Sequence, residues 1–165
     1  MSNLLNNLRI PFLEDDIEWR IQQQGLSKGM PWALVLAYVT NRAIMDRLDE
    51  VVGPENWTND FTQSPNGGVL CTLGVRVEET WVYKTDGADN TEIEKVKGGL
   101  SNAMKRAGVQ WGIGRYLYKL PTTFAKFEGE GRFKTRIDGS PYRWNPPALT
   151  NEFLPPKTKT SKGDK

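Results

Sequence analysis

The feature that most restricts the fold of this 165-residue chain is an amphipathic segment that begins near Thr91. Thr91 is followed three residues later by Glu94, a capping-box pattern that predicts where a helix starts. At roughly 100° per residue, the apolar side chains that follow share one face of this helix. They are Ile93, Val96, Leu100, Ala103, Met104, Ala107 and Trp111. The segment therefore predicts a helix with one buried face, and a second apolar surface elsewhere in the chain that covers it.

The opposite face of the same predicted helix is polar and mostly basic. Its members are Lys95, Lys97, Asn102, Lys105 and Arg106. Residues 96–120 contain five basic residues and no acidic residue. Because no acidic residue follows Glu94 at i,i+4 spacing, these charges are not neutralised along the helix.

Three glycines, Gly98, Gly99 and Gly108, interrupt the helical pattern. Each lowers helix propensity by up to about 1 kcal/mol relative to alanine. Glycine permits close approach of another backbone, and a phosphodiester chain is one candidate. Close packing on a neighbouring helix or strand is an equally good explanation, and the sequence leaves both open.

Charge is divided unevenly between the two halves of the chain. Residues 1–94 contain 7 basic and 15 acidic residues, a net charge of −8. Residues 95–143 contain 11 basic and 3 acidic residues, a net charge of +8. Such asymmetry indicates a polyanionic partner for the basic half, or head-to-tail contact between copies of the chain. The two interpretations are compatible.

Composition argues against catalysis and against a metal or cofactor. The chain has no histidine and one cysteine, so the commonest general base is absent and the usual structural zinc sites cannot be built. A nuclease with a carboxylate-bound metal would depend on the acidic pairs Asp15-Asp16 and Glu78-Glu79, which we interpret as exposed surface residues. Cys71 lies in an apolar run, which predicts a buried thiol and fits a reducing compartment. No run approaches 18 apolar residues, so we predict no membrane span and a cytoplasmic location.

The pattern along the chain predicts an α+β fold. We expect a short helix over residues 14–24, and a longer helix over 31–53 that starts at Pro31 and ends at Gly53. Two or three antiparallel strands follow between residues 56 and 85, with a tight hairpin at Gly67-Gly68 and a further break near Glu78-Glu79. Residues 121–154 predict a basic irregular extension with one hairpin near Asp138-Gly139. Residues 155–165 predict a disordered tail.

Aromatic residues are interleaved with basic ones from the end of the predicted helix onward. The basic residues are Arg115, Lys119, Lys126, Arg132, Lys134 and Arg136, and the aromatic ones are Trp111, Tyr116, Tyr118, Phe124, Phe127 and Phe133. Phosphates contact cations and bases stack on rings in proteins that bind single strands. A membrane surface would need a second apolar stripe, and duplex reading would need a helix free to enter the major groove. Single-stranded nucleic acid is therefore the predicted partner.

Two runs carry a resemblance to a known family. The segment "IEKVKGGLSNAMKRAGVQWGIGRYLY", residues 93–118, and the segment "LDEVVGPENW", residues 48–57, resemble the Rad52/22 family of single-strand annealing proteins. The similarity extends over roughly residues 12–120 and is greatest to the compact versions carried by bacteriophages. The first run is specific, whereas the second is weaker but precedes the strands as expected.

The resemblance implies a fold and an assembly. It implies a β-β-β-α core, an antiparallel sheet packed with helices, whose subunits form a ring or arc. On this basis residues 1–28 are an N-terminal arm with a short helix, and residues 29–120 are the annealing core. Single-stranded DNA would lie in a basic groove around the ring, with its bases turned outward. Complementary strands would then anneal, without ATP, during homologous recombination and DNA repair in a bacterial cell.

The resemblance also implies site residues. By motif match, Lys105 and Arg106 would contact phosphates, with Lys97 as a third. Arg42 lies one position from the place of a family groove arginine, which aligns on Ala43. Further candidates on or after the basic helix are Lys95, Arg115 and Lys119. The expected partners are single-stranded DNA, further copies of the chain and, as an additional candidate, a single-stranded-DNA-binding protein. A passive coating protein is the alternative function.

Overall fold

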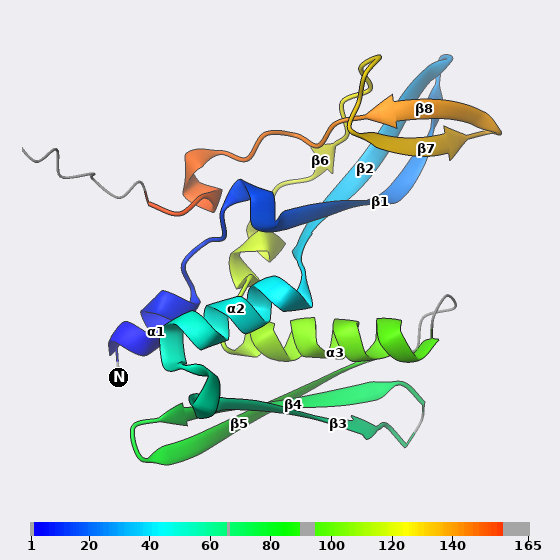
Figure 1. Ribbon diagram of the computed structural model, residues 1–165. Helices are drawn as coiled ribbons and strands as arrows, with labels where there is room; N and C mark the ends of the chain where they lie inside the picture. Colours follow the sequence, from blue (N-terminus) through cyan, green and yellow to red (C-terminus); the bar gives the residue numbers. More distant parts are fainter. Residues whose placement is uncertain (1, 66, 90–94, 157–165) are drawn as a thin grey trace, which may run out of the picture.

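The computed structural model describes residues 2–65, 67–89 and 95–156. A layer of helices lies between two β regions (Figure 1). The helices are α1 (Ser2–Leu8), α2 (Asn41–Val52) and α3 (Lys95–Gln110). This arrangement confirms the predicted α+β class with antiparallel sheets packed on helices. Among the residues described, no helix is long and apolar enough to cross a membrane.

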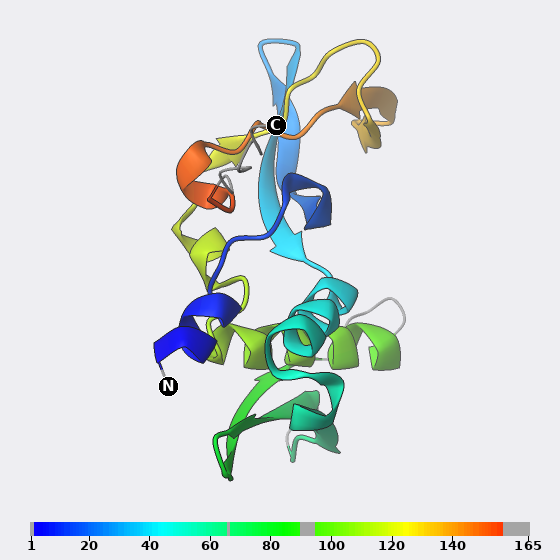
Figure 2. The same cartoon turned by 60° about the vertical axis from the view of Figure 1, so that its left-hand side comes forward.

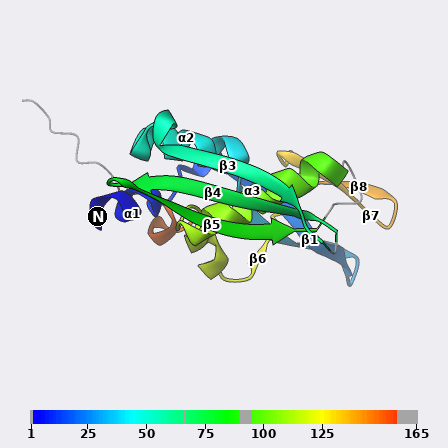
Figure 3. The same ribbon diagram turned by 90° about the horizontal axis from the view of Figure 1, so that it is seen from below.

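The lower sheet contains three antiparallel strands in the order β3-β4-β5 (Figure 3). They are β3 (Trp57–Gln63), β4 (Val69–Val77) and β5 (Thr80–Ala88). Gly67 and Gly68 have φ of 91° and 84°, and Glu78 has φ of 56°, so both chain reversals occur where the sequence predicted them. Cys71 lies fully buried on the inner face, and burial raises the pKa of its thiol to about 11, as expected for a structural cysteine.

The apolar face of α3 packs on this sheet, as predicted. Ala103, Met104, Ala107 and Trp111 are all buried, and the Trp111 indole nitrogen donates to the Leu73 carbonyl at 3.1 Å. The bond satisfies the polar edge of a large buried ring and fixes the end of α3 on the central strand. Ile93 and the Thr91–Glu94 capping pattern lie outside the described residues, and so does the side chain of Val96.

Gly108 packs against another helix. A Cβ added at Gly108 would meet the Ile44 side chain of α2 at 3.6 Å, an ordinary contact distance. Close packing therefore does not require glycine at this position, and because Gly108 is buried, a phosphodiester chain does not approach it.

The prediction of a short helix over residues 14–24 is wrong. Only a 3₁₀ turn, η1 (Glu14–Asp16), precedes a long strand, β1 (Ile17–Ser27). Ile17 and Trp19 are buried while Glu18 and Arg20 between them are exposed, an alternation of period two that suits a strand. The acidic first turn that suggested a helix belongs to η1 alone.

The prediction of a helix that starts at Pro31 is also wrong over residues 31–40. Residues 30–39 form strand β2 (Met30–Val39), which pairs antiparallel with β1. The helix α2 begins at Asn41 because the Thr40 hydroxyl accepts the Ala43 amide proton at 3.2 Å and caps it. Its predicted end at Gly53, with φ of 86°, is confirmed.

The C-terminal part lies beside the β1–β2 hairpin (Figures 1 and 2). Its strands are β6 (Thr123–Phe124), β7 (Phe133–Ile137) and β8 (Ser140–Trp144), with 3₁₀ turns η3 (Arg115–Lys119) and η4 (Asn151–Phe153). The predicted hairpin at Asp138-Gly139 is confirmed, since both have positive φ. The Gln24 side chain joins the two hairpins by donating to the Arg136 carbonyl at 2.8 Å. Residues 157–165 of the predicted tail lie outside the described part.

Tyr116 fastens the N-terminal segment to the helical layer. The Phe12 amide donates to its hydroxyl at 2.9 Å, and its ring stacks on Phe153 at 6.5 Å between centroids. Arg47 of α2 donates to the Ile10 carbonyl at 2.6 Å and lies 4.1 Å from the centre of the Phe12 ring. Tyr116 therefore links residues from the beginning and the end of the chain, and Arg47 joins the first of these to α2.

Replacement of Tyr116 by phenylalanine is expected to lower the free energy of unfolding by about 1 kcal/mol, because the part-buried Phe12 amide loses its acceptor. Urea denaturation followed by circular dichroism measures the change. The matched control is Tyr118→Phe, at a tyrosine that is 72% exposed. Equal losses for the two variants would contradict the linking role of Tyr116.

Candidate nucleic-acid interface

A cleft of about 980 Å³ separates the β1–β2 hairpin from α3 and the adjoining ends of the lower sheet. Three basic residues line it, Arg20 from β1 and the neighbouring pair Lys105 and Arg106 from α3. The cleft thus brings together two of the cations that the sequence singled out and one that it did not.

Lys105 is half-buried against the hairpin. Its ammonium nitrogen lies 4.7 Å from the centre of the Tyr38 ring, and the Tyr38 hydroxyl donates to Glu18 at 3.0 Å. Burial lowers the pKa of Lys105, the charge of Arg20 lowers it further, and Glu18 partly opposes both. A partly desolvated ammonium that faces another cation gains from the arrival of an anion.

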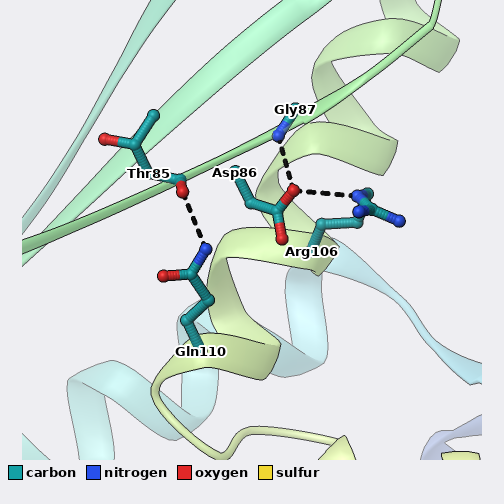
Figure 4. Close-up of polar contacts among 5 residues, drawn as sticks. All are labelled: Thr85, Asp86, Gly87, Arg106 and Gln110. Atoms are coloured by element: carbon teal, nitrogen blue, oxygen red, sulfur yellow. Dashed lines mark hydrogen bonds and ion pairs between the residues drawn. The ribbon is translucent and has the colours of Figure 1, made fainter.

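Arg106 projects from the next position of α3 and meets the end of β5 (Figure 4). Its Nε donates to the Asp86 carboxylate at 3.0 Å, and the Gly87 amide donates to the same oxygen at 2.7 Å. Burial alone would raise the pKa of Asp86, but the hydrogen bonds from Gly87 and Arg106 outweigh it, so the pKa is lowered. Nearby, Gln110 donates to the Thr85 carbonyl at 2.7 Å, which joins the helix to β5.

Arg20 was missed by the sequence analysis. It reaches the cleft because β1 is a strand, where Arg20 lies on the face opposite to buried Trp19. The signal was the alternation of apolar and polar residues over 17–22, which favours a strand over the helix that was predicted.

Arg115 binds the C-terminal end of α3. Its guanidinium donates to the carbonyls of Val109 and Gln110 at 2.8 and 2.7 Å, and Lys84 donates to the Gln110 carbonyl at 3.0 Å. Cations that bind the last carbonyls of a helix stabilise its negative end. Arg115 is not among the residues that line the cleft.

Two of the other predicted cations are described by the structure and do not line the cleft. Arg42, at the start of α2, and Lys119, in η3, are exposed, and neither lines the cleft. Lys95 and Lys97 belong to the first turn of α3, but their side chains lie outside the described part of the structure. The pair Lys105 and Arg106 is therefore the portion of the predicted set that the structure gathers.

The rest of the cleft lining is mixed, with the polar residues Gln22, Asn102 and Asp89 beside apolar ones. Its side chains include Val35, Val39, Val69, Leu70, Val109, Ile113 and Leu117. Tyr118, which is mostly exposed, also lines it. Cations beside an apolar and aromatic surface can hold phosphates and bases at the same time. Across the described residues, no group of three histidine, cysteine, aspartate or glutamate side chains is placed to hold a metal ion.

The chain is similar to one protein family and to proteins of two Deinococcus species. A match to the Rad52/22 family double-strand break repair protein covers residues 1–131. The chain is 33% identical over 134 residues to the single-stranded DNA-binding protein DdrA of Deinococcus radiodurans, which is 80% of this chain and 62% of that protein. It is 34% identical over 123 residues to DdrA of Deinococcus deserti, 73% of this chain and 59% of that protein. The chain thus spans about three fifths of these relatives.

Proposed function

The chain belongs to the Rad52/22 family of double-strand break repair proteins, and from this premise we propose that it binds single-stranded DNA in the cleft and promotes annealing of complementary strands. The observation that carries the proposal is the convergence of Arg20, Lys105 and Arg106 from two separate elements on one cleft. The name of both relatives, single-stranded DNA-binding protein, supports the same substrate.

The geometry favours a single strand over a duplex. One face of α3 is buried on the lower sheet, and Lys105 on another face lies against Tyr38 of the hairpin. A helix covered on two sides cannot enter the major groove. A flexible single strand can follow a cleft, with phosphates on the cations and bases over the apolar surface or turned outward.

The mechanism requires no covalent chemistry. Cations of the cleft neutralise phosphates and release counterions, so that binding is independent of sequence. A strand held extended presents its bases to a second strand, and correct pairing supplies on the order of 1.4 kcal/mol per base-pair step. Homology is thus read by DNA itself, and the protein acts as an annealer that does not consume ATP.

Assembly into a ring or arc is part of the proposal. The net charges of −8 for residues 1–94 and +8 for residues 95–143 favour contact between unlike halves of neighbouring copies. Such a head-to-tail contact closes into a ring when its rotation divides the circle evenly. The phage-type resemblance, the cytoplasmic location and the single-stranded-DNA-binding protein as partner stay predictions.

Replacement of Arg20 or Lys105 by alanine is expected to weaken single-strand binding and flatten its salt dependence. Replacement of Arg106 is expected to do so to a smaller extent, because Asp86 already pairs with Arg106. Each lost phosphate contact lowers the slope of log K against log salt by about 0.7 and costs about fivefold in affinity at 0.1 M salt. Fluorescence anisotropy with a labelled oligonucleotide measures both quantities. Arg42→Ala and Lys119→Ala are the matched controls, because both remove an exposed cation outside the cleft lining. Equal loss in cleft and control variants would contradict the site.

Mixing complementary oligonucleotides separates the annealer from the passive coating protein. The wild-type protein is expected to accelerate duplex formation above the spontaneous rate, because it holds strands in a form ready to pair. A fluorescence-quenching assay follows the rate. A slower rate at saturating protein would show that the chain coats DNA without annealing it.

Light scattering at low and high salt tests the assembly. We expect a mass several times that of one chain at low salt, falling as salt screens contacts between the acidic and basic halves. The same monomeric mass at both salt concentrations would discard the ring and the arc.

A further inference from the structure

We propose that Asp86 competes with DNA phosphate for Arg106 and thereby sets the affinity of the cleft at a level that permits release of the strand. The inference rests on the single-strand binding proposed above. It assigns to Asp86 a role opposite to that of the cations: the residue weakens binding through its contact with one of them.

Asp86 does not itself line the cleft, but its carboxylate occupies hydrogen-bond donors of Arg106 and Gly87, which do. Its carboxylate accepts from Arg106 Nε at 3.0 Å, and the Gly87 amide holds the same oxygen at 2.7 Å (Figure 4). An amide and a guanidinium that converge on one oxygen are the donors that a phosphate commonly finds in proteins. The carboxylate therefore stands in for a phosphate at the edge of the cleft.

The exposure of the two side chains shows which partner can move. The Arg106 side chain is 54% exposed, whereas that of Asp86 is 27% exposed and is tied to its own strand by the Gly87 amide. Arg106 is thus the mobile member, free to turn from a fixed carboxylate toward an incoming phosphate. While the pair is closed, the two charges cancel, and Arg106 contributes little to the attraction of DNA.

Releasable binding suits annealing. A protein that holds a strand too tightly keeps it from pairing, because the product duplex must leave the cleft. An internal anion that restores the ion pair as soon as phosphate departs lowers the barrier to exchange. Lys105 shows no ion pair among the described contacts, where Tyr38 is its neighbour, so the competition acts on Arg106 alone.

The opposite role for Asp86 would be to orient Arg106 for phosphate. The contact between them runs through Nε, with no second hydrogen bond from the guanidinium to the carboxylate among the described residues. A single contact to a half-exposed side chain leaves the plane of the guanidinium free to rotate. Orientation and competition predict opposite signs for loss of the charge, so one experiment separates them.

The experiment compares the full-length wild type with D86N, R106A and the double variant, by anisotropy with a labelled oligonucleotide over a salt series. Asn keeps an acceptor for the Gly87 amide, removes the charge and replaces the second carboxylate oxygen by an NH2 group. D86N is expected to raise affinity about fivefold at 0.1 M salt and to steepen the salt slope by about 0.7, the effect of one further phosphate contact. In the R106A background, D86N is expected to change affinity by less than about twofold, since the competitor no longer has a target.

The control is D60N, which removes one negative charge from an exposed position of β3 outside the cleft lining. Unchanged or weaker binding by D86N would overturn the inference, as would an equal gain from D60N or an equal gain in the R106A background. Absence of single-strand binding by the wild type would instead overturn the proposed function. Faster dissociation of D86N than of wild type would also count against the competition.

Discussion

Packing of the apolar face of α3 on the lower sheet is the constraint on which the rest of the structure depends. Met104 and Trp111 are buried there, and the bond from Trp111 to the Leu73 carbonyl sets the end of the helix on the central strand. Once this face is fixed, Lys105 lies toward Tyr38 of the hairpin and Arg106 toward Asp86 at the end of β5. The β1–β2 hairpin supplies the facing wall, and the cleft is the space that remains between them.

Basic residues in and around α3 fall into two groups, those that stabilise the end of the helix and those that face the cleft. Lys84 and Arg115 bind the last carbonyls of the helix and stabilise its negative end. Lys105 and Arg106 turn toward the cleft, where each has a modest partner, the Tyr38 ring and the Asp86 carboxylate. The basic character of the segment therefore comes partly from the needs of the helix and partly from the cleft, and a count of charges does not separate the two.

Local patterns predicted α3 and the lower sheet because each is encoded by neighbouring residues. Period-3.6 apolar spacing marked α3, and Gly67-Gly68 and Glu78 marked the turns. The β1–β2 hairpin was not predicted, because the acidic residues at 14–16 and Pro31 are both typical of helix starts. The pairing of β1 with β2 also depends on contacts between residues that are distant in the sequence. Arg20 was not predicted as a site residue because it lies on β1 of this hairpin. Lys105 and Arg106 were found from the motif, but their partners Tyr38 and Asp86 come from other elements and needed the three-dimensional structure.

The location of a bound strand is the most direct test of the central claim, that the space between the hairpin and α3 is a site for single-stranded DNA. Photo-cross-linking with an oligonucleotide that carries 4-thiothymidine, followed by mass spectrometry of the adducts, maps the contacts residue by residue. The account predicts adducts at Tyr38, Lys105 and Tyr118. Adducts confined to Trp81 and Tyr83 on β5 would contradict it, because those exposed rings lie outside the cleft lining.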